Sequence, residues 1–326
     1  SMSELCDLSA VELRRRIGCK DVSPVELLDS CIDRIEAVNG TLNAMVSTCY
    51  ERARDEAKAA EQAVMDGEFL GVLHGLPIGI KDLEQTEGLR TTLGSKLYED
   101  NIPASDQISV ANMRDEGAVV IGKTNTPEFG AGANTRNLVF GATGNPFDPT
   151  KTCAGSSGGS AVALAAGMVP IASGSDYGGS LRTPAAYCGV VGFRPTPGVV
   201  PAEAKPAGLL PFSVLGPMGR SVGDAALLLS AQASIDPRDP YSRSLDPALF
   251  EPMREADLSS IRVAISEDLG AAPVSKAYRD IFKSRTDSFR HVFDEAQDRD
   301  PDFTDVHDCF EVLRGVVFVG AHGERV

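Results

Sequence analysis

The sequence predicts an α/β protein with a mixed, largely parallel central sheet covered by helices on both faces. Segments of helical spacing alternate along the chain with short apolar runs. That alternation is typical of a sheet that is buried on both faces. The chain has 326 residues, of which 42% are hydrophobic and 24% charged, so it is long and apolar enough to bury a large core.

Three helices are expected before residue 66. The first two lie within residues 8–38, and the third, rich in alanine and charged residues, covers 50–65. Each of the first two begins with a serine followed three residues later by glutamate, which is the capping-box pattern. These pairs are Ser9 with Glu12 and Ser23 with Glu26.

The alternation continues through the rest of the sequence. Strands are expected at 76–82, 118–122, 169–173, 189–193 and 261–265. Helices are expected at 106–116, 160–167, 222–233, 274–293 and 304–318. Loops, rich in polar residues, glycine and proline, are expected at 125–153, 197–215 and 236–258.

Residues 1–326 are interpreted as one domain with three parts. Residues 1–65 form a helical N-terminal part, 66–233 the catalytic core and 234–326 a peripheral part. The sequence ends shortly after an apolar helical pattern. Two interpretations of this end are left open: the protein is naturally short, or a C-terminal tail is missing from the peripheral part.

The charge and cysteine content exclude several classes of protein. The formal net charge is −15, which disfavours binding to nucleic acid or to an anionic membrane surface. No apolar run reaches the length of a membrane span. The seven cysteines are scattered without metal-type spacing, which favours reduced thiols and a cytoplasmic location. We expect no metal and no cofactor.

Two glycine-rich loops that carry serines indicate a catalytic pocket. The first is Gly155–Ser160 and the second is Gly174–Arg182. Glycine allows backbone N–H groups to approach a ligand closely, and a serine hydroxyl becomes a nucleophile when a base removes its proton. Ser180 is the candidate nucleophile. The alternatives are that Ser180 is a turn serine and that Ser156 is a helix N-cap.

The candidate base is Lys81, which lies on the apolar, glycine-interrupted run Leu76–Asp82. A lysine normally titrates near ~10.4, and burial lowers this pKa because it disfavours the charged amine. The alternative is a surface lysine paired with Asp82. Only four histidines are present, and none is well placed in a motif to act as the base.

These motifs resemble the amidase signature family. The resemblance rests on Gly79–Asp82, Gly122–Gly130, Gly155–Ser160, Gly174–Ala185, Gly192–Thr196 and Gly216–Val222. It implies the fold of that family, an acyl-enzyme on Ser180, a relay through Ser156 and a base at Lys81. It also implies a cis peptide bond between Gly155 and Ser156.

Further site residues are expected around the nucleophile. The expected oxyanion hole consists of backbone N–H groups of Tyr177, Gly178, Gly179 and Ser180. The expected supporting residues are Ser157, Asp176 and Arg182, the last two as a buried ion pair. Tyr177 replaces a threonine that is common in the family, and its ring either shapes the acyl pocket or points into the core.

The predicted function is hydrolysis of a linear C–N bond in a small molecule, such as an amide, anilide or carbamate, with esters as further substrates. The expected partner is this small-molecule substrate, with no nucleic acid and no membrane, and self-association into a homo-oligomer is left open. The first alternative is the glutamine-hydrolysing amidase subunit of a tRNA-dependent amidotransferase. The second is a phosphate or nucleotide binder that uses Gly155–Ser160, although this loop lacks the Gly-Lys-Ser/Thr ending of a P-loop.

Overall fold

The computed structural model describes residues 4–203, 205, 209–246, 249–250, 253 and 255–325. The protein divides into two compact units, Ser1–Glu251 and Pro252–Val326, and each is described by itself.

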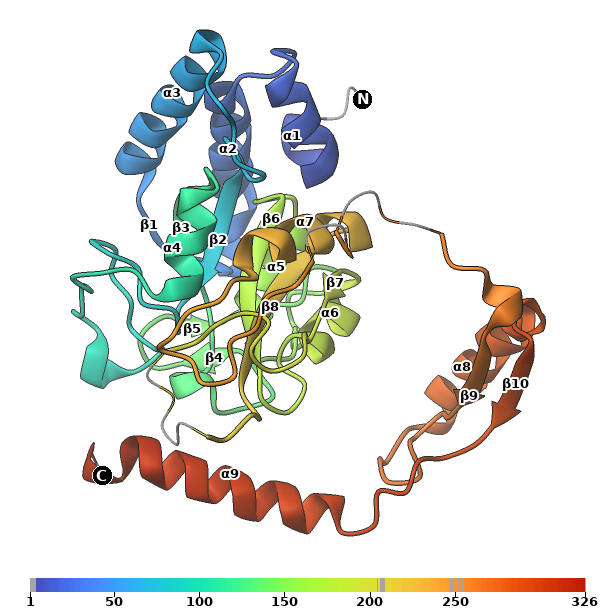
Figure 1. The fold of residues 1–326 in the computed structure, drawn as a ribbon. Coiled ribbons are helices and arrows are strands. Elements are labelled where there is room, and N and C mark those ends of the chain that lie inside the picture. The colour runs from blue at the N-terminus through green and yellow to red at the C-terminus, as the bar shows by residue number, and fades with distance from the viewer. Residues whose placement is uncertain are drawn as a thin grey trace. The chain divides into compact units, whose positions relative to one another are not determined.

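The first unit contains a six-stranded sheet, a two-stranded ribbon and the helices that surround them (Figure 1). The helices are α1 (Ala10–Gly18), α2 (Pro24–Leu42), α3 (Tyr50–Asp66), α4 (Ile108–Asp115), α5 (Gly158–Ala165), α6 (Arg182–Cys188) and α7 (Val222–Gln232). The strands are β1 (Met45–Thr48), β2 (Pro77–Lys81), β3 (Val119–Thr124), β4 (Arg136–Asn137), β5 (Gly141–Ala142), β6 (Ile171–Asp176), β7 (Val191–Gly192) and β8 (Val214–Gly219).

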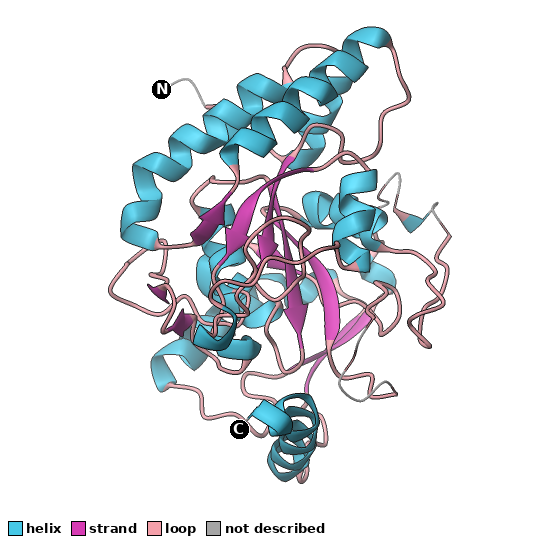
Figure 2. Ribbon diagram, turned by 90° about the vertical axis from the view of Figure 1, so that its left-hand side faces the viewer, coloured by secondary structure: helices cyan, strands magenta, loops and turns pink. Residues whose placement is uncertain are grey.

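The six-stranded sheet is mixed, in the order β1-β3-β2-β6-β8-β7. The central strands β3, β2 and β6 are parallel, whereas β1 is antiparallel to β3 and β8 is antiparallel to both β6 and β7. Four strands (β3, β2, β6 and β7) therefore run in one direction. Helices lie on both faces of the sheet (Figure 2). The predicted fold class is confirmed.

The N-terminal helices begin where their caps predict. Ser23 accepts hydrogen bonds from the N–H groups of Val25 and Glu26, and the Glu26 carboxylate accepts the N–H of Ser23, which completes the capping box of α2. Ser9 caps α1 by accepting the N–H of Glu12. These contacts satisfy N–H groups that the first helical turn leaves without partners.

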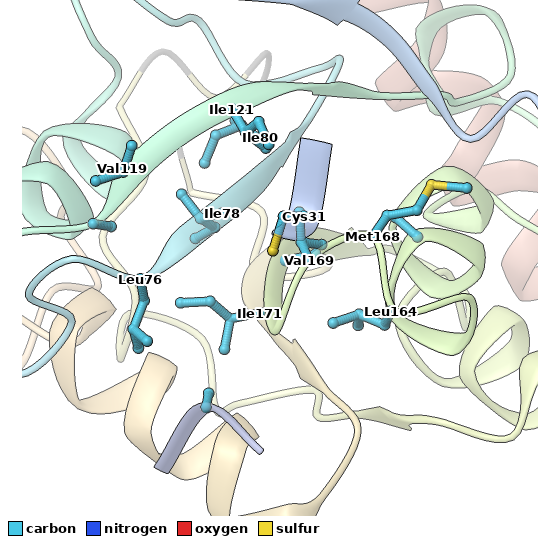
Figure 3. Close-up of a cluster of buried hydrophobic side chains, with 14 of the residues drawn as sticks. Cys31, Leu76, Ile78, Ile80, Val119, Ile121, Leu164, Met168, Val169 and Ile171 are labelled. Atoms are coloured by element: carbon cyan, nitrogen blue, oxygen red, sulfur yellow. The ribbon is translucent and has the colours of Figure 1, made fainter. Parts of the chain in front are cut away.

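The core lies between the central strands and the helices that cover them. Ile78, Ile80 and Ile171 are fully buried side chains of β2 and β6, and they gather with residues of β3, α2 and α5 (Figure 3). Burial of one such side chain contributes about 1.5–3 kcal/mol. This packing holds β2 rigidly in the middle of the sheet, and β2 is the strand that ends at Lys81.

Two strands of the sheet were not predicted. β8 pairs with β6 through six residues although Pro217 lies within it and the preceding residues were predicted as loop. Proline normally argues against a central strand because it has no N–H to donate. The carbonyl of Pro217 still accepts the N–H of Phe193 at 3.2 Å. The other unpredicted strand, β1, lies at the sheet edge.

Within its described residues, the second unit contains two parallel strands and two α-helices. These are β9 (Arg262–Ile265), α8 (Lys276–Phe289), β10 (Glu295–Asp298) and α9 (Val306–His322). The strand β10 was not predicted, and α9 continues beyond the expected end at residue 318. No helix in the described part of the protein has the combination of length and apolar character that a bilayer crossing requires.

Candidate active site

Lys81 is the last residue of β2, and its side chain is completely buried. The alternative of a surface lysine is therefore wrong. Its neighbour Asp82 points elsewhere, because the carboxylate of Asp82 accepts hydrogen bonds from the hydroxyl and the N–H of Thr92. A central strand thus delivers one amine to the interior without an adjacent ion pair.

Three serine hydroxyls surround the amine of Lys81. Its Nζ donates to Ser156 Oγ at 2.7 Å, to Ser157 Oγ at 2.8 Å and to Ser175 Oγ at 2.9 Å. An ammonium group has three donors and no acceptor, so these contacts use its full donor capacity. Lys81 and the predicted relay Ser156 are in direct contact.

Burial lowers the pKa of Lys81 to about 7 from its ordinary value of 10.5. The cause is desolvation, which disfavours the charged amine, while the negative charges of Glu84 and Asp176 act in the opposite direction. A pKa near 7 means that a large fraction of the amine is neutral at neutral pH. A neutral amine is able to accept a proton from a hydroxyl group.

The loop that carries Ser156 and Ser157 is held by close backbone packing. The peptide bond between Gly155 and Ser156 is cis, as expected. A Cβ on Gly159 would lie 2.1 Å from the backbone nitrogen of Asn125, so only glycine fits at this position. Ser157, rather than Ser156, occupies the N-cap position of α5, and its hydroxyl makes no capping bond there. The N-cap interpretation of Ser156 is therefore wrong.

The loop after β6 is organised around the buried carboxylate of Asp176. This carboxylate accepts the N–H groups of Gly179 at 2.8 Å and Leu181 at 3.2 Å. Arg182 donates to it at 3.0 and 3.1 Å, and Arg194 donates at 3.0 Å. The expected ion pair of Asp176 and Arg182 is present, but the side chain of Arg182 is 55% exposed, so only the carboxylate is buried.

These donors determine the protonation of Asp176. Burial by itself would raise the pKa of the carboxyl group, but the hydrogen bonds from Arg182 and from the N–H groups of Gly179 and Leu181 outweigh it and lower the pKa to about 2. The carboxylate is therefore ionised throughout the neutral range, and the loop that carries Ser180 is tied to a fixed negative charge.

Ser180 is half-buried and follows Gly179, whose φ of 116° lies in the region that favours glycine. Its carbonyl accepts the N–H of Ser157 at 3.2 Å, which joins the two serine loops. Within the described part of the protein, the hydroxyl of Ser180 makes no hydrogen bond. The structure thus brings Lys81 and Ser156 together, and it connects the backbone of Ser180 to Ser157, the residue that follows Ser156.

The predicted oxyanion hole is partly engaged in this conformation. The N–H of Gly179 already donates to Asp176. The ring of Tyr177 meets the ring of Phe212 edge-on, with centroids 5.9 Å apart, and Tyr177 is half-buried. The oxyanion hole and the role of Tyr177 in the acyl pocket stay predictions.

A family model described as Amidase matches residues 26–292. The protein belongs to the amidase family. The matched residues include the glycine-rich loop Gly155–Ser160, which brings Ser156 to Lys81.

Two curated relatives of this protein carry different names. The A subunit of the glutamyl-tRNA(Gln) amidotransferase of Carboxydothermus hydrogenoformans is 39% identical over 296 residues, which cover 90% of the present sequence and 61% of the relative. The acylamidase of Rhodococcus erythropolis is 39% identical over 267 residues, which cover 82% of the present sequence and 56% of the relative. The present sequence thus spans about 60% of the length of these relatives.

Two solved structures share the fold. A bacterial aryl acylamidase of the amidase signature family is 33% identical with a TM-score of 0.83, and the match covers 90% of this protein and 61% of that one. A 6-aminohexanoate cyclic dimer hydrolase is 29% identical with a TM-score of 0.81, and the match covers 91% of this protein and 61% of that one.

Two residues that contact the site, Ser175 and Arg194, have no role predicted from the sequence. Ser175 accepts a hydrogen bond from Lys81, and Arg194 holds both the carboxylate and the carbonyl of Asp176. The signal for Ser175 was its position in a buried strand, where a polar side chain needs a partner. Arg194 lies in a motif of the family, but nothing local indicates its partner.

Proposed function

We propose that this amidase hydrolyses a linear C–N bond of a small molecule through an acyl-enzyme on Ser180. Lys81 is the base and Ser156 is the relay. The observation that carries the proposal is the contact of 2.7 Å between a fully buried lysine and Ser156, together with a lysine pKa of about 7. A buried amine that titrates near neutrality among hydroxyl groups is suited to general-base catalysis.

The first half of the proposed reaction forms the acyl-enzyme. Neutral Lys81 takes the proton of Ser156, and Ser156 takes the proton of Ser180. The Oγ of Ser180 attacks the carbonyl carbon and forms a tetrahedral intermediate. As the C–N bond breaks, the proton held by Lys81 returns through Ser156 to the leaving nitrogen, which departs as the amine.

The second half releases the acid. A water molecule gives one proton to Ser156, which passes its own proton to Lys81, and the resulting hydroxide attacks the acyl carbon. The C–O bond to Ser180 breaks, and the Oγ of Ser180 recovers a proton through the same relay. Atoms and charges balance, and the cycle returns Lys81 to its neutral form.

Backbone N–H groups of Tyr177, Gly178, Gly179 and Ser180 are proposed to bind the oxyanion. One such donor is worth about 3–4 kcal/mol of transition-state stabilisation. The bond from the N–H of Leu181 to Asp176 supports this role, because it fixes the direction of the backbone next to the nucleophile. The N–H of Gly179 donates to Asp176 and would have to leave it to bind the oxyanion. We also propose Ser157, Asp176 and Arg182 as supporting residues.

The proposed substrates are amides, anilides or carbamates, with esters as further substrates. An acylamidase and an aryl acylamidase are among the relatives, and the aromatic pair of Tyr177 and Phe212 lies beside the nucleophile loop.

The proposed compartment is the cytoplasm. All seven cysteines are unpaired, which supports a reducing, cytoplasmic compartment.

Replacement of Ser180 by alanine tests the assignment. The wild-type protein is incubated with a fluorophosphonate and with a panel of anilides, and adducts are located by intact-mass and peptide mass spectrometry. We expect one adduct on Ser180, and S180A should lose both the adduct and hydrolysis. The control S288A removes a serine of α8 and should behave as wild type. Full activity of S180A would refute the assignment.

A second candidate is the amidase subunit of a glutamyl-tRNA amidotransferase. It is favoured by the relative from Carboxydothermus hydrogenoformans, which carries that name. In this case the same residues would release ammonia from glutamine for a partner protein. Glutaminase activity that appears only after copurification with other polypeptides would support this candidate, and anilide hydrolysis by the isolated protein would favour the first.

A further inference from the structure

The backbone pairing of β2 differs on its two sides near Lys81. Toward β3 the register continues to the end, with Lys81 opposite Thr124. Toward β6 it stops after Gly79, which lies opposite Ala172. The N–H of Lys81 donates instead to a side chain, the hydroxyl of Ser173, at 3.1 Å. The position of the proposed base relative to β6 thus depends on a serine side chain.

Ser173 is itself held by a buried carboxylate. Its hydroxyl donates to Glu84 Oε1 at 2.5 Å, and the other oxygen of Glu84 accepts the hydroxyl of Ser109 on α4 at 2.7 Å. Glu84 is only 1% exposed, and Ser173 and Ser109 are completely buried. A buried hydroxyl that accepts one bond and donates another has a fixed orientation, so Glu84 determines which way Ser173 faces.

A tight turn returns Glu84 to the strand it supports. The N–H of Glu84 donates to the carbonyl of Lys81 at 2.9 Å, so the backbone reverses within three residues. The backbone carbonyl of Glu84 also accepts a bond from the amine of Lys123, a second fully buried lysine, which donates to Thr86 Oγ1 at 2.8 Å as well. Glu84 is therefore anchored from β2, β3 and α4.

The charges around this network come from four elements. The ammonium of Lys81 faces Glu84 from the turn and Asp176 from β6. The carboxyl of Glu84 faces Lys123 from β3 as well as Lys81 from β2, and α4 contributes the neutral Ser109. Burial raises the pKa of this carboxyl, and the hydroxyl donors and the two lysines act in the opposite direction, toward the carboxylate. Among the described residues, removal of the charge on Glu84 therefore leaves Asp176 as the negative charge that faces the amine.

We propose that Glu84 is a positioning residue for the hydrolytic reaction: through Ser173 it fixes the end of β2 that presents Lys81, and its carboxylate balances the charge of the Lys81 ammonium. This inference rests on the proposed function, since it concerns the base of that reaction. Glu84 does not touch the reacting atoms and acts only through Lys81.

The variant E84Q removes the negative charge of residue 84 and keeps the size and shape of its side chain. A glutamine keeps the acceptor for Ser173 and fills the same space, but it removes the negative charge that favours the ammonium form of Lys81. The acidic limb of kcat/KM reports deprotonation of the base in the free enzyme. We expect E84Q to move this limb to lower pH by about one unit.

The variant S173A tests the mechanical part separately. It removes the acceptor of the Lys81 N–H. We expect kcat to fall about tenfold while KM changes less than about twofold, because misplacement of the base affects the chemical step more than binding. An unchanged kcat in S173A would overturn the positioning role, even if E84Q does not fold.

The control is D224N. Asp224 on α7 is another fully buried carboxylate, and it accepts the N–H of Val11 at 3.1 Å, but it does not face Lys81. D224N should lower the melting temperature and leave the acidic limb in place. The charge-balancing role would be overturned if the acidic limb of kcat/KM in E84Q coincided with that of wild type. It would also be overturned if the limb of D224N moved as far as that of E84Q.

The rate of fluorophosphonate labelling at Ser180 is followed over the same pH range. A wild-type protein that neither hydrolyses anilides nor labels at Ser180 would refute the proposed function itself. A wild-type protein that does both, with E84Q and S173A unchanged from it, would refute only the role of Glu84.

Discussion

Replacement of Lys81 by methionine should change the stability of the fold with a sign that depends on pH. Burial lowers the pKa of Lys81 from 10.5 to about 7. At about 1.4 kcal/mol per pH unit, charging this amine in the folded state costs about 5 kcal/mol at low pH. Methionine avoids that cost but gives up three hydrogen bonds, worth about 1 kcal/mol each.

The sign follows from proton linkage. Between pH 7 and 10.5 the unfolded lysine binds more protons than the folded one, so wild-type stability rises with pH in this window. Below pH 7 the full cost is present, and above 10.5 it is absent. We therefore expect K81M to be more stable than wild type by about 2 kcal/mol at about pH 6, equal near about pH 8 to 9, and less stable by about 2 kcal/mol at about pH 10.

Urea unfolding followed by far-UV circular dichroism at several pH values measures this difference. The control K58M removes a lysine on α3 whose side chain is 66% exposed, and it reports the effect of losing a surface charge. The prediction would be refuted if the difference in unfolding free energy between K81M and wild type were the same at about pH 6 and about pH 10. In that case burial would not make charging of Lys81 unfavourable in the folded state.

Two further predictions concern the loops of the site. G159A should fail to give soluble, folded protein, because its Cβ would lie 2.1 Å from the backbone nitrogen of Asn125; a wild-type melting curve for G159A would contradict this close packing. R194M should destabilise by about 2–3 kcal/mol and lower kcat, because it removes bonds to both the carbonyl and the buried carboxylate of Asp176. R182M should cost about 1 kcal/mol or less, because that arginine is 55% exposed; chemical denaturation and anilide kinetics compare the two, and equal losses would contradict the ranking.

The parts of the fold that were predicted depend on local contacts. The capping box of Ser23 and Glu26 lies within four residues, so the start of α2 is visible in the sequence. The strand β8 was missed because Gly216 and Pro217 are poor strand residues by themselves. They adopt extended structure because β6 and β7 pair with β8 from both sides, and this information is not local.

Some residues of the candidate site were likewise predicted from the sequence and others were not. Lys81 and Ser156 were identified from motifs, and the structure places them in contact. Ser175 and Arg194 were not identified, because their roles depend on contacts between residues 94 and 18 positions apart, respectively. Residues that carry the chemistry were recognisable from the sequence, whereas the roles of the residues that orient them follow only from the three-dimensional structure.

The hydrogen bonds between Lys81 and the three hydroxyls around it must change direction when the amine gains or loses a proton. As a cation, Nζ offers one hydrogen to each neighbour; as a free amine it keeps two hydrogens and gains a lone pair, so one neighbour must reverse and point its own hydrogen inward. The hydroxyl of Ser157 already directs its hydrogen to the carbonyl of Ser175 at 3.3 Å. The reversal therefore falls to Ser156 or Ser175, and each titration of the amine is accompanied by rotation about a single Cβ–Oγ bond.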